Sequence, residues 1–218
     1  MAFIEGKFVP DFSEENKLQK DGFLYIAGLD EVGRGSLAGP VVTGLVVFPA
    51  GADYEWLASV RDSKELTSKK REELAPLIKS TALVAEIGMS TAEEIDDLGI
   101  VTATRLAMQR SLDAALLMPQ FLLIDAIKLP SSNIPQKSIV KGDSKCLSIA
   151  ASSILAKVTR DSLMSGLSLE YPGYGFEKHK GYGTSKHLEA INRLGPCRLH
   201  RLTFAPMNTM KTNETEPD

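Results

Sequence analysis

Residues 25–35 read YIAGLDEVGRG, an apolar run that ends in two adjacent acids and a glycine-flanked arginine. The apolar part predicts a buried strand over Leu24–Leu29, so that Asp30 and Glu31 emerge at its end. Two neighbouring carboxylates at such a place are costly unless a cation neutralises them. The glycines on either side of Arg34 let the backbone approach a bulky group, and a guanidinium suits phosphate. The segment therefore predicts a site that combines metal and phosphate binding.

The rest of the chain predicts a layered α/β domain. Three strands come first, and later strands alternate with helices, which favours a mixed sheet. A capping box is expected where Thr91 precedes Glu94 by three residues, and Pro76 is expected to limit or kink its helix. Apolar or β-branched runs predict further strands at Val41–Phe48, Ala82–Met89, Phe121–Ile124 and Ser138–Lys141. Amphipathic or capped segments predict helices at Ser68–Lys79, Ala92–Leu98, Val101–Met118, Ile149–Leu163 and Ser185–Leu194.

The chain has 218 residues, of which 43% are hydrophobic, enough for one well-cored domain or for one domain with a small appendage. We expect an N-terminal excursion packed on the body over residues 1–20 and a main domain over 21–166. A basic lobe of helices and loops is expected over 167–211, followed by a disordered acidic tail over 212–218.

Composition favours a soluble cytoplasmic protein. No stretch approaches the roughly 18 uncharged apolar residues of a membrane span, and the polar N-terminus does not resemble a signal peptide. Cys146 and Cys197 are far apart and outside any metal-type cysteine pair. Both are expected to be reduced.

The charge is polarised along the chain, although the net charge is only −3. Residues 1–136 hold 13 Lys+Arg and 20 Asp+Glu, whereas residues 137–211 hold 12 Lys+Arg and 5 Asp+Glu. A basic C-terminal part can face a polyanion despite a mildly acidic total. The alternative is a solvated basic surface without a partner.

Two more aspartates, Asp125 and Asp143, also follow apolar runs, where open α/β sheets place their chemistry. If they converge with Asp30 and Glu31, each pair of like charges about 4 Å apart costs about 4 kcal/mol at an effective dielectric of 20. Divalent cations remove that cost, and ligation by oxygen alone selects hard ions such as Mg²⁺ or Mn²⁺. Taken singly, Asp125 and Asp143 also fit turn or helix-capping roles.

A dinucleotide-binding loop is a rival interpretation of the glycines in residues 33–39. That motif needs a helix that begins within the glycines, so that its N-terminus holds pyrophosphate. Here Gly39 and Pro40 stop any helix, and strand-like residues follow. Asp30 and Glu31 would also repel the phosphates.

Residues 26–41, IAGLDEVGRGSLAGPV, closely resemble the opening motif of the type 2 ribonucleases H, specifically ribonuclease HII. The similarity continues, in order, through residues 62–66, 141–143, 149–161 and 179–182. Ribonuclease HIII is similar, but it lacks arginine between the two glycines and carries an extra N-terminal domain. The resemblance implies an RNase H-like fold, with a five-stranded mixed sheet flanked by helices and a helical C-terminal extension.

The resemblance also implies an endonuclease that hydrolyses the RNA strand of RNA–DNA hybrids and cuts on the 5′ side of single ribonucleotides embedded in duplex DNA. The products would carry 3′-hydroxyl and 5′-phosphate ends. Two divalent ions, Mg²⁺ or Mn²⁺, are implied, with the family's acidic ligands falling on Asp30, Glu31, Asp125 and Asp143. A monomer without membrane or obligate protein partner is expected. A hybrid-binding module that has lost its chemistry and a resolvase-like or transposase-like core are the alternatives.

Substrate-binding roles carry over to Gly33, Arg34 and Gly35, which would read the 2′-hydroxyl, and to Tyr182, which would sense the RNA-to-DNA junction. Ala126 departs from the family, because many members have glycine after the third acid.

The sequence also predicts roles for several residues outside the acidic set. Ser152 and Ser153 are expected to allow close packing of a helix on the sheet. Phosphate contacts are expected from Lys64, Lys157 and Arg160. Phosphate contacts or plain surface positions are expected for His179, His187 and His200.

Overall fold

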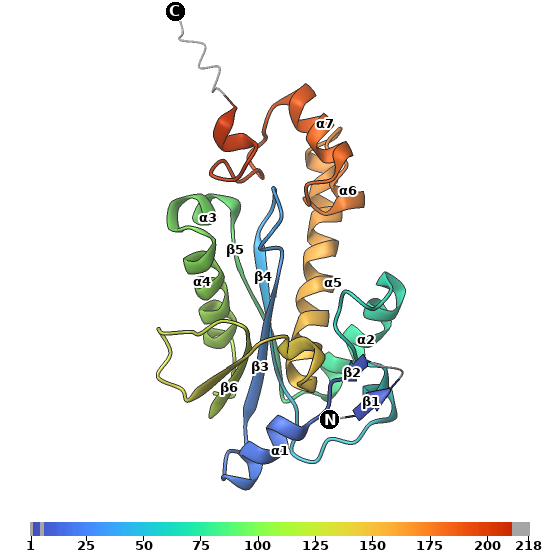
Figure 1. Cartoon of the computed structure of the whole chain (residues 1–218), viewed down its shortest axis with the longest axis vertical. Helices are drawn as coiled ribbons and strands as arrows, with labels where there is room; N and C mark the ends of the chain where they lie inside the picture. Colours follow the sequence, from blue (N-terminus) through green and yellow to red (C-terminus); the bar gives the residue numbers. More distant parts are fainter. Residues whose placement is uncertain (1, 5–6, 211–218) are drawn as a thin grey trace, which may run out of the picture.

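The computed structural model describes residues 2–4 and 7–210, and a five-stranded sheet lies at its centre (Figure 1). The strand order is β5-β4-β3-β6-β7. Strand β4 is antiparallel to β5 and β3, whereas β6 is parallel to β3 and β7 is parallel to β6. This arrangement confirms the predicted mixed sheet. The acidic tail over 212–218 lies outside the described residues. The strands are β3 (Ile26–Val32), β4 (Val41–Val47), β5 (Val84–Ser90), β6 (Phe121–Asp125) and β7 (Gln136–Ile139).

Helices cover both faces of the sheet. In Figure 1, α3 and α4 lie on one side of β3 and β4, and α2 and α5 lie on the other. A separate two-stranded sheet pairs β1 (Ala2–Ile4) with β2 (Lys7–Val9). The α-helices are α1 (Ser13–Lys20), α2 (Ser68–Thr81), α3 (Ala92–Leu98), α4 (Ile100–Asp113), α5 (Leu147–Glu170), α6 (Phe176–His179) and α7 (Ser185–Leu194). The short 3₁₀ turns are η1 (Glu55–Ser59), η2 (Gly142–Ser144) and η3 (Met207–Thr209).

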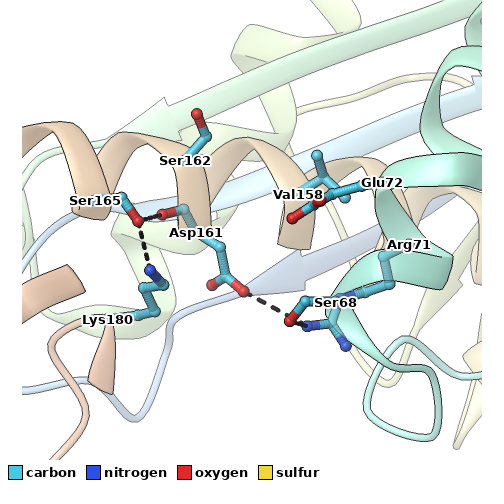
Figure 2. A pocket seen from close by; sticks show the side chains of 8 residues that line it. All are labelled: Ser68, Arg71, Glu72, Val158, Asp161, Ser162, Ser165 and Lys180. Atoms are coloured by element: carbon cyan, nitrogen blue, oxygen red, sulfur yellow. Dashed lines mark hydrogen bonds and ion pairs between the residues drawn. The ribbon is translucent and has the colours of Figure 1, made fainter. Parts of the chain in front are cut away.

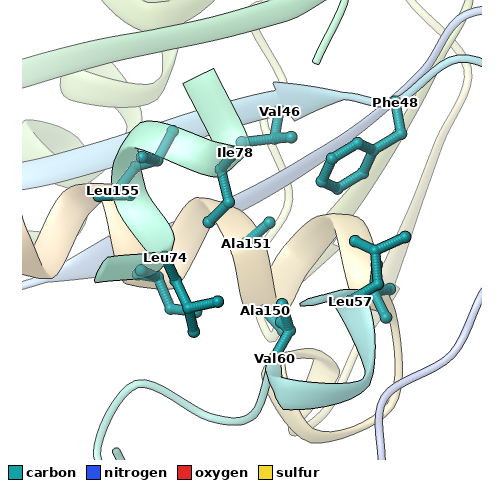
Figure 3. Close-up of a cluster of buried hydrophobic side chains, with 12 residues drawn as sticks. Val46, Phe48, Leu57, Val60, Leu74, Ile78, Ala150, Ala151 and Leu155 are labelled. Carbon is teal, nitrogen blue, oxygen red and sulfur yellow. The ribbon is translucent and has the colours of Figure 1, made fainter. Parts of the chain in front are cut away.

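Strand β4 is buried along its whole length because helices pack on both of its faces. Successive side chains of a strand point to opposite faces. Leu45 therefore packs in a cluster with Met108 of α4, whereas Val46 packs with Ile78 of α2 and Leu155 of α5 (Figure 3). The continuous apolar run in the sequence reflects this two-sided burial.

Helix α5 lies very close to the sheet. A Cβ atom built on Gly44 would lie 2.2 Å from the Ser152 carbonyl oxygen, and one built on Gly28 would lie 2.2 Å from the Ser148 carbonyl carbon. Glycine on the strands and small residues on the helix therefore permit this contact, as predicted for Ser152.

Several element ends differ from the prediction. Strand β3 continues to Val32 because it keeps its antiparallel pairing up to Val42, so Asp30 and Glu31 lie within the strand instead of after it. Strand β7 begins and ends two residues earlier than predicted, and Lys141 beyond it adopts a left-handed φ of 55°.

Among the helices, α4 ends at Asp113, five residues before the predicted end. Pro76 does not terminate α2, which continues to Thr81. The predicted capping box of Thr91 and Glu94 is present at the start of α3.

The C-terminal segment packs against the far end of α5. Phe176 of α6 and Ala190 of α7 share an apolar cluster with Met164 of α5 and Ala38. Helix α5 runs unbroken across residue 166, where a domain boundary was expected, and the division into domains stays a prediction. None of the helices in the described part of the chain combines the length and hydrophobicity that a bilayer crossing requires.

Candidate active site

The predicted acids meet at one edge of the sheet. Strands β3 and β6 are parallel, with Leu29 opposite Ile124, so the register places Asp30 beside Asp125. Asp143 reaches the same edge from η2, whose Gly142 N–H donates a 2.7 Å hydrogen bond to Asp125 Oδ1.

Asp30 is the most deeply buried of the four acids, at 4% exposure. Loss of hydration on burial raises its pKa well above the usual value, and repulsion from Glu31, Asp125 and Asp143 adds to the shift. A hydrogen bond from Ser153 opposes the shift. Burial also raises the pKa of Glu31. The electrostatic influence of all three other acids on Asp30 means that the carboxylates lie close enough to repel one another.

The pKa of Asp143 is also raised by burial and by neighbouring carboxylates. Burial raises its pKa to about 6, and repulsion from Asp62 and Asp125 contributes. Asp62 is a further acid beside the site that was not assigned a role from the sequence, although it lies in a segment that resembles the family.

Two basic side chains partly neutralise this edge. Arg34 Nη1 lies 3.1 Å from Glu31 Oε1, and Lys64 Nζ lies 3.6 Å from Asp143 Oδ2. Lys64 is 78% exposed, so solvent screens its contribution. These two cations face four acids, so this edge of the sheet keeps an excess of negative charge.

The donor set fits a hard divalent cation. Glu31 Oε2 is buried and accepts no hydrogen bond within the described part of the chain, and an orphaned carboxylate oxygen is costly without a partner. The acids offer oxygen atoms alone, the ligands that Mg²⁺ and Mn²⁺ prefer. Among residues 2–4 and 7–210, no three Asp, Glu, His or Cys side chains are placed to share one metal ion as they stand.

A cleft of about 590 Å³ opens beside the acids. It is lined by Gly33, Arg34 and Gly35 after β3, together with Lys157 of α5 and Tyr182. Gly33 has a φ of 95°, a conformation that favours glycine, and a Cβ atom on Gly35 would meet nothing within 4 Å. Most of the predicted substrate-binding residues therefore share one cavity.

Arg71 and Ser153 also line this cleft, although no motif in the sequence singled out Arg71. Arg71 Nη1 donates to the Ser63 carbonyl at 2.7 Å, and Ser63 Oγ lies 2.8 Å from Ser153 Oγ. These contacts join the segment before α2 to α5. Side chains that pair across 90 residues of sequence leave no local signal that would reveal them.

A second cavity, of about 460 Å³, adjoins the cleft and shares Arg71 with it. Figure 2 shows Asp161 of α5 pointing toward Arg71, and their charged groups lie 3.7 Å apart. Asp161 also accepts a 2.8 Å hydrogen bond from Lys157. Asp161 therefore partly neutralises two basic residues of the cleft, and Lys157, at 17% side-chain exposure, is held in place by it.

The prediction that Arg160 contacts phosphate is wrong. Arg160 is fully buried, and its guanidinium donates to the carbonyl oxygens of Ala38, Pro40 and Lys180. Its position on α5 lies beneath a loop instead of facing solvent, so substrate has no access to it.

The expectation for two histidines is also wrong. His187 and His200 are 0% and 2% exposed, and their Nε2 atoms lie 3.1 Å apart in a hydrogen bond. His187 Nδ1 also bonds the Tyr182 carbonyl at 2.9 Å. Tyr182 itself is half-buried, with its ring centroid 5.6 Å from Lys157 Nζ. These histidines are packing groups behind the cleft.

The comparisons with known proteins agree with one another. The family model of ribonuclease HII matches residues 27–207. A ribonuclease HII of Dehalococcoides mccartyi is 52% identical over 201 residues, which cover 92% of this chain and 95% of the relative. One of Bacillus cytotoxicus is 50% identical over 200 residues, covering 92% and 76%.

Solved structures show the same fold. The ribonuclease H2 of Pyrococcus horikoshii aligns with a TM-score of 0.69 at 26% identity, covering 85% of this chain and 96% of that one. The ribonuclease HIII named Bst-RNase HIII, solved in complex with Mn²⁺, aligns with a TM-score of 0.61 at 22% identity, covering 85% and 68%. With the fold, the acidic edge and the cleft, these matches show that the chain belongs to the ribonuclease HII family and is an endoribonuclease that cleaves RNA in RNA–DNA hybrids.

Proposed function

We propose that the enzyme also cuts duplex DNA on the 5′ side of a single embedded ribonucleotide, leaving 3′-hydroxyl and 5′-phosphate ends. The observation that carries this proposal is one cleft lined by the glycine-arginine-glycine loop, by Tyr182 and by Glu31 of the acidic edge. A site for this reaction must read a ribose, read the deoxyribose that follows it, and hold the phosphodiester bond on the 5′ side of that ribose at the reactive groups.

We assign Asp30, Glu31, Asp125 and Asp143 as the ligands of two divalent cations, Mg²⁺ or Mn²⁺. The raised pKa values of Asp30 and Asp143 and the unpartnered Glu31 Oε2 support this assignment. When bound, such ions activate water and stabilise the leaving 3′-oxygen. Bst-RNase HIII, a structural relative, was solved with Mn²⁺. Glu31 and Asp143 would then exchange their contacts with Arg34 and Lys64 for the cations.

The ribose is distinguished from deoxyribose only by its 2′-hydroxyl, which both donates and accepts hydrogen bonds. Backbone groups of Gly33 and Gly35 can approach that hydroxyl closely because no side chain intervenes. Arg34, which is 39% exposed at its side chain, is suited to an adjacent phosphate. Tyr182 would pack on the next sugar, and its ring favours one without a 2′-hydroxyl.

The test replaces Tyr182 with alanine. We expect the rate of cleavage at a lone ribonucleotide in duplex DNA to fall by about tenfold or more relative to a continuous RNA–DNA hybrid, because aromatic packing on a nucleotide contributes about 1–3 kcal/mol. Cleavage of both substrates by the purified enzyme in Mg²⁺ provides the measurement.

The matched control is Tyr54→Ala. Tyr54 is 38% exposed, and its ring stacks on Trp56. It follows the C-terminal end of β4, which pairs with the start of β3 and so lies away from the acids. This variant should leave the ratio of the two rates unchanged. Equal losses on both substrates in Tyr182→Ala would refute the junction-sensing role.

A further inference from the structure

Two buried arginines lie behind the loop that lines the cleft. Arg160 of α5 and Arg201 after α7 are both 0% exposed. Main-chain carbonyl groups, instead of carboxylates, accept their hydrogen bonds within the described residues. Burying a guanidinium without a carboxylate partner is unfavourable, so this arrangement calls for a reason beyond packing.

Arg201 fixes the direction of the loop's peptide groups. Its guanidinium donates to the carbonyl oxygens of Gly33 at 2.7 Å and Arg34 at 2.8 Å. In a trans peptide the C=O and N–H groups point in opposite directions. The N–H groups of Arg34 and Gly35 therefore face away from Arg201, and in the described part of the chain neither donates a hydrogen bond to the protein. Arg201 thus leaves two amides free to bind a substrate oxygen.

Arg160 contacts other carbonyl groups of the same loop. It donates to Pro40 at 2.9 Å and to Ala38 at 3.0 Å. Its side chain also lies directly against Gly33, where a Cβ atom would approach Arg160 Nε to 2.2 Å. Any larger residue than glycine at position 33 would displace the arginine.

Arg160 also contacts the segment that carries Tyr182. Its guanidinium donates to the Lys180 carbonyl at 2.8 Å and lies 5.4 Å from the centroid of the Tyr182 ring. The two segments touch directly as well, because Leu37 N–H donates to the Gly181 carbonyl at 2.8 Å. Arg160 is thus one side chain that contacts both the loop after β3 and the tyrosine segment.

We infer that Arg160 is a positioning residue that sets the separation between the ribose-reading loop and Tyr182, and thereby the preference for a ribonucleotide followed by DNA. This inference rests on the proposed function. Within the described residues, the side-chain hydrogen bonds of Arg201 go to the loop alone, which every ribonucleotide must contact, so we expect it to support cleavage of both substrates alike. Lysine retains the charge but lacks the planar fork of donors that lets arginine bridge several carbonyls at once.

The test compares Arg160→Lys with the matched variant Arg201→Lys on a lone ribonucleotide in duplex DNA and on a continuous RNA–DNA hybrid. We expect Arg160→Lys to lower kcat on the lone ribonucleotide about tenfold or more relative to the hybrid, since small misplacements of binding groups have effects of this size. Arg201→Lys should lower both activities by similar factors. Thermal unfolding of each variant verifies that it is folded.

A double-variant cycle identifies the route of the effect. In a Tyr182→Ala background, Arg160→Lys should no longer change the ratio of the two activities, because the residue through which it acts has been removed. The inference is overturned if Arg160→Lys lowers both activities equally, or if it shifts the ratio by the same factor with and without Tyr182.

Gly181→Ala gives a second test that keeps both guanidinium groups, in case Arg160→Lys does not fold. A Cβ atom at Gly181 would lie 2.3 Å from the Ala38 carbonyl oxygen, so the substitution forces the two segments apart. We expect a shift of the activity ratio in the same direction, and an unchanged ratio would contradict the inference. If Tyr182→Ala is itself unselective, the proposed junction role fails, and the inference fails with it. If Tyr182→Ala is selective but Gly181→Ala and Arg160→Lys are not, the inference alone fails.

Discussion

Single residues around the acidic edge adopt conformations that ordinary folding disfavours. Asp30 is a buried carboxylate repelled by its neighbours, and Gly33 has a φ of 95°. Ala126, directly after Asp125, has a φ of 53°, in the left-handed region where an L-residue with a Cβ atom is strained by roughly 1–2 kcal/mol. Its N–H donates to the Ile139 carbonyl at 3.1 Å, which fixes the turn that directs Asp125 into the site.

We predict that Ala126→Gly raises the free energy of unfolding by about 1 kcal/mol, because glycine adopts this conformation without steric cost. Chemical denaturation measures the change. The control is Ala114→Gly at a φ of −77°, where the same substitution should lower stability because it only adds freedom to the unfolded chain. A loss of stability in Ala126→Gly would contradict the conformational argument.

At the residue scale, the sequence predicts the members of the site better than their surroundings. Asp30, Glu31 and Arg34 form a local string whose chemistry can be read directly. Arg160 could not be placed in this way, because its partners Ala38 and Pro40 lie 120 or more residues earlier in the chain and its burial follows from tertiary packing. The same holds for His187, which bonds His200 behind the cleft.

At the scale of elements, the C-terminal helices depend on a buried imidazole cluster. The ring of His187 in α7 stacks on that of His179 in α6, with the ring centroids 4.3 Å apart. His187 also forms a hydrogen bond with His200, which follows α7. The Cys197 N–H donates to His200 Nδ1, so the neutral His200 donates through Nε2 to His187 Nε2. His187 Nδ1–H then donates to the Tyr182 carbonyl. This chain of hydrogen bonds requires both imidazoles to stay neutral.

Stability should therefore fall in mild acid. Burial lowers the pKa of His187 to about 4, from an ordinary value of 6.5. Because the folded-state pKa is the lower one, the unfolded chain takes up the proton first, and stability is lost as pH falls from about 6.5 toward 4. We predict a loss of about 2 kcal/mol between pH 7 and 5 from this residue.

The measurement compares unfolding free energies of the wild type and His187→Asn at both pH values. Asparagine cannot titrate, yet its amide can still donate to the Tyr182 carbonyl. The wild type should lose more stability than the variant on acidification. Identical losses would mean that His187 is not held neutral by the fold.

The existence and order of the elements were largely predictable, whereas their ends were not. Apolar periodicity is a local property, and it revealed each strand of the sheet and the helices between them. The end of β3 depends on its pairing with β4, and the end of α4 at Asp113 is not visible in the apolar pattern that continues to Leu117. Such boundaries are set by partners distant in sequence.

At the scale of the whole molecule, the site lies where the oppositely charged parts of the sequence meet. Residues 1–136 carry the excess of acids and supply Asp30, Glu31 and Asp125, and residues 137–211 carry the excess of basic residues and supply Lys157 and Tyr182. The division is not complete, because Asp143 comes from the basic part, and Arg34 and Lys64 come from the acidic part. The excess of basic residues in 137–211 still suits that part to a polyanionic substrate.

The most direct test of the central claim is calorimetric titration of Mn²⁺ into the wild type, Asp143→Asn and Asp53→Asn. Asp53 is an exposed acid after the C-terminal end of β4, which pairs with the start of β3. It therefore lies away from the four acids and serves as the control. We predict saturable binding to the wild type and Asp53→Asn, and affinity weakened by about tenfold or more in Asp143→Asn, because a ligand is lost. Unchanged binding in Asp143→Asn, or no saturable binding to the wild type, would contradict the assignment of these acids as metal ligands.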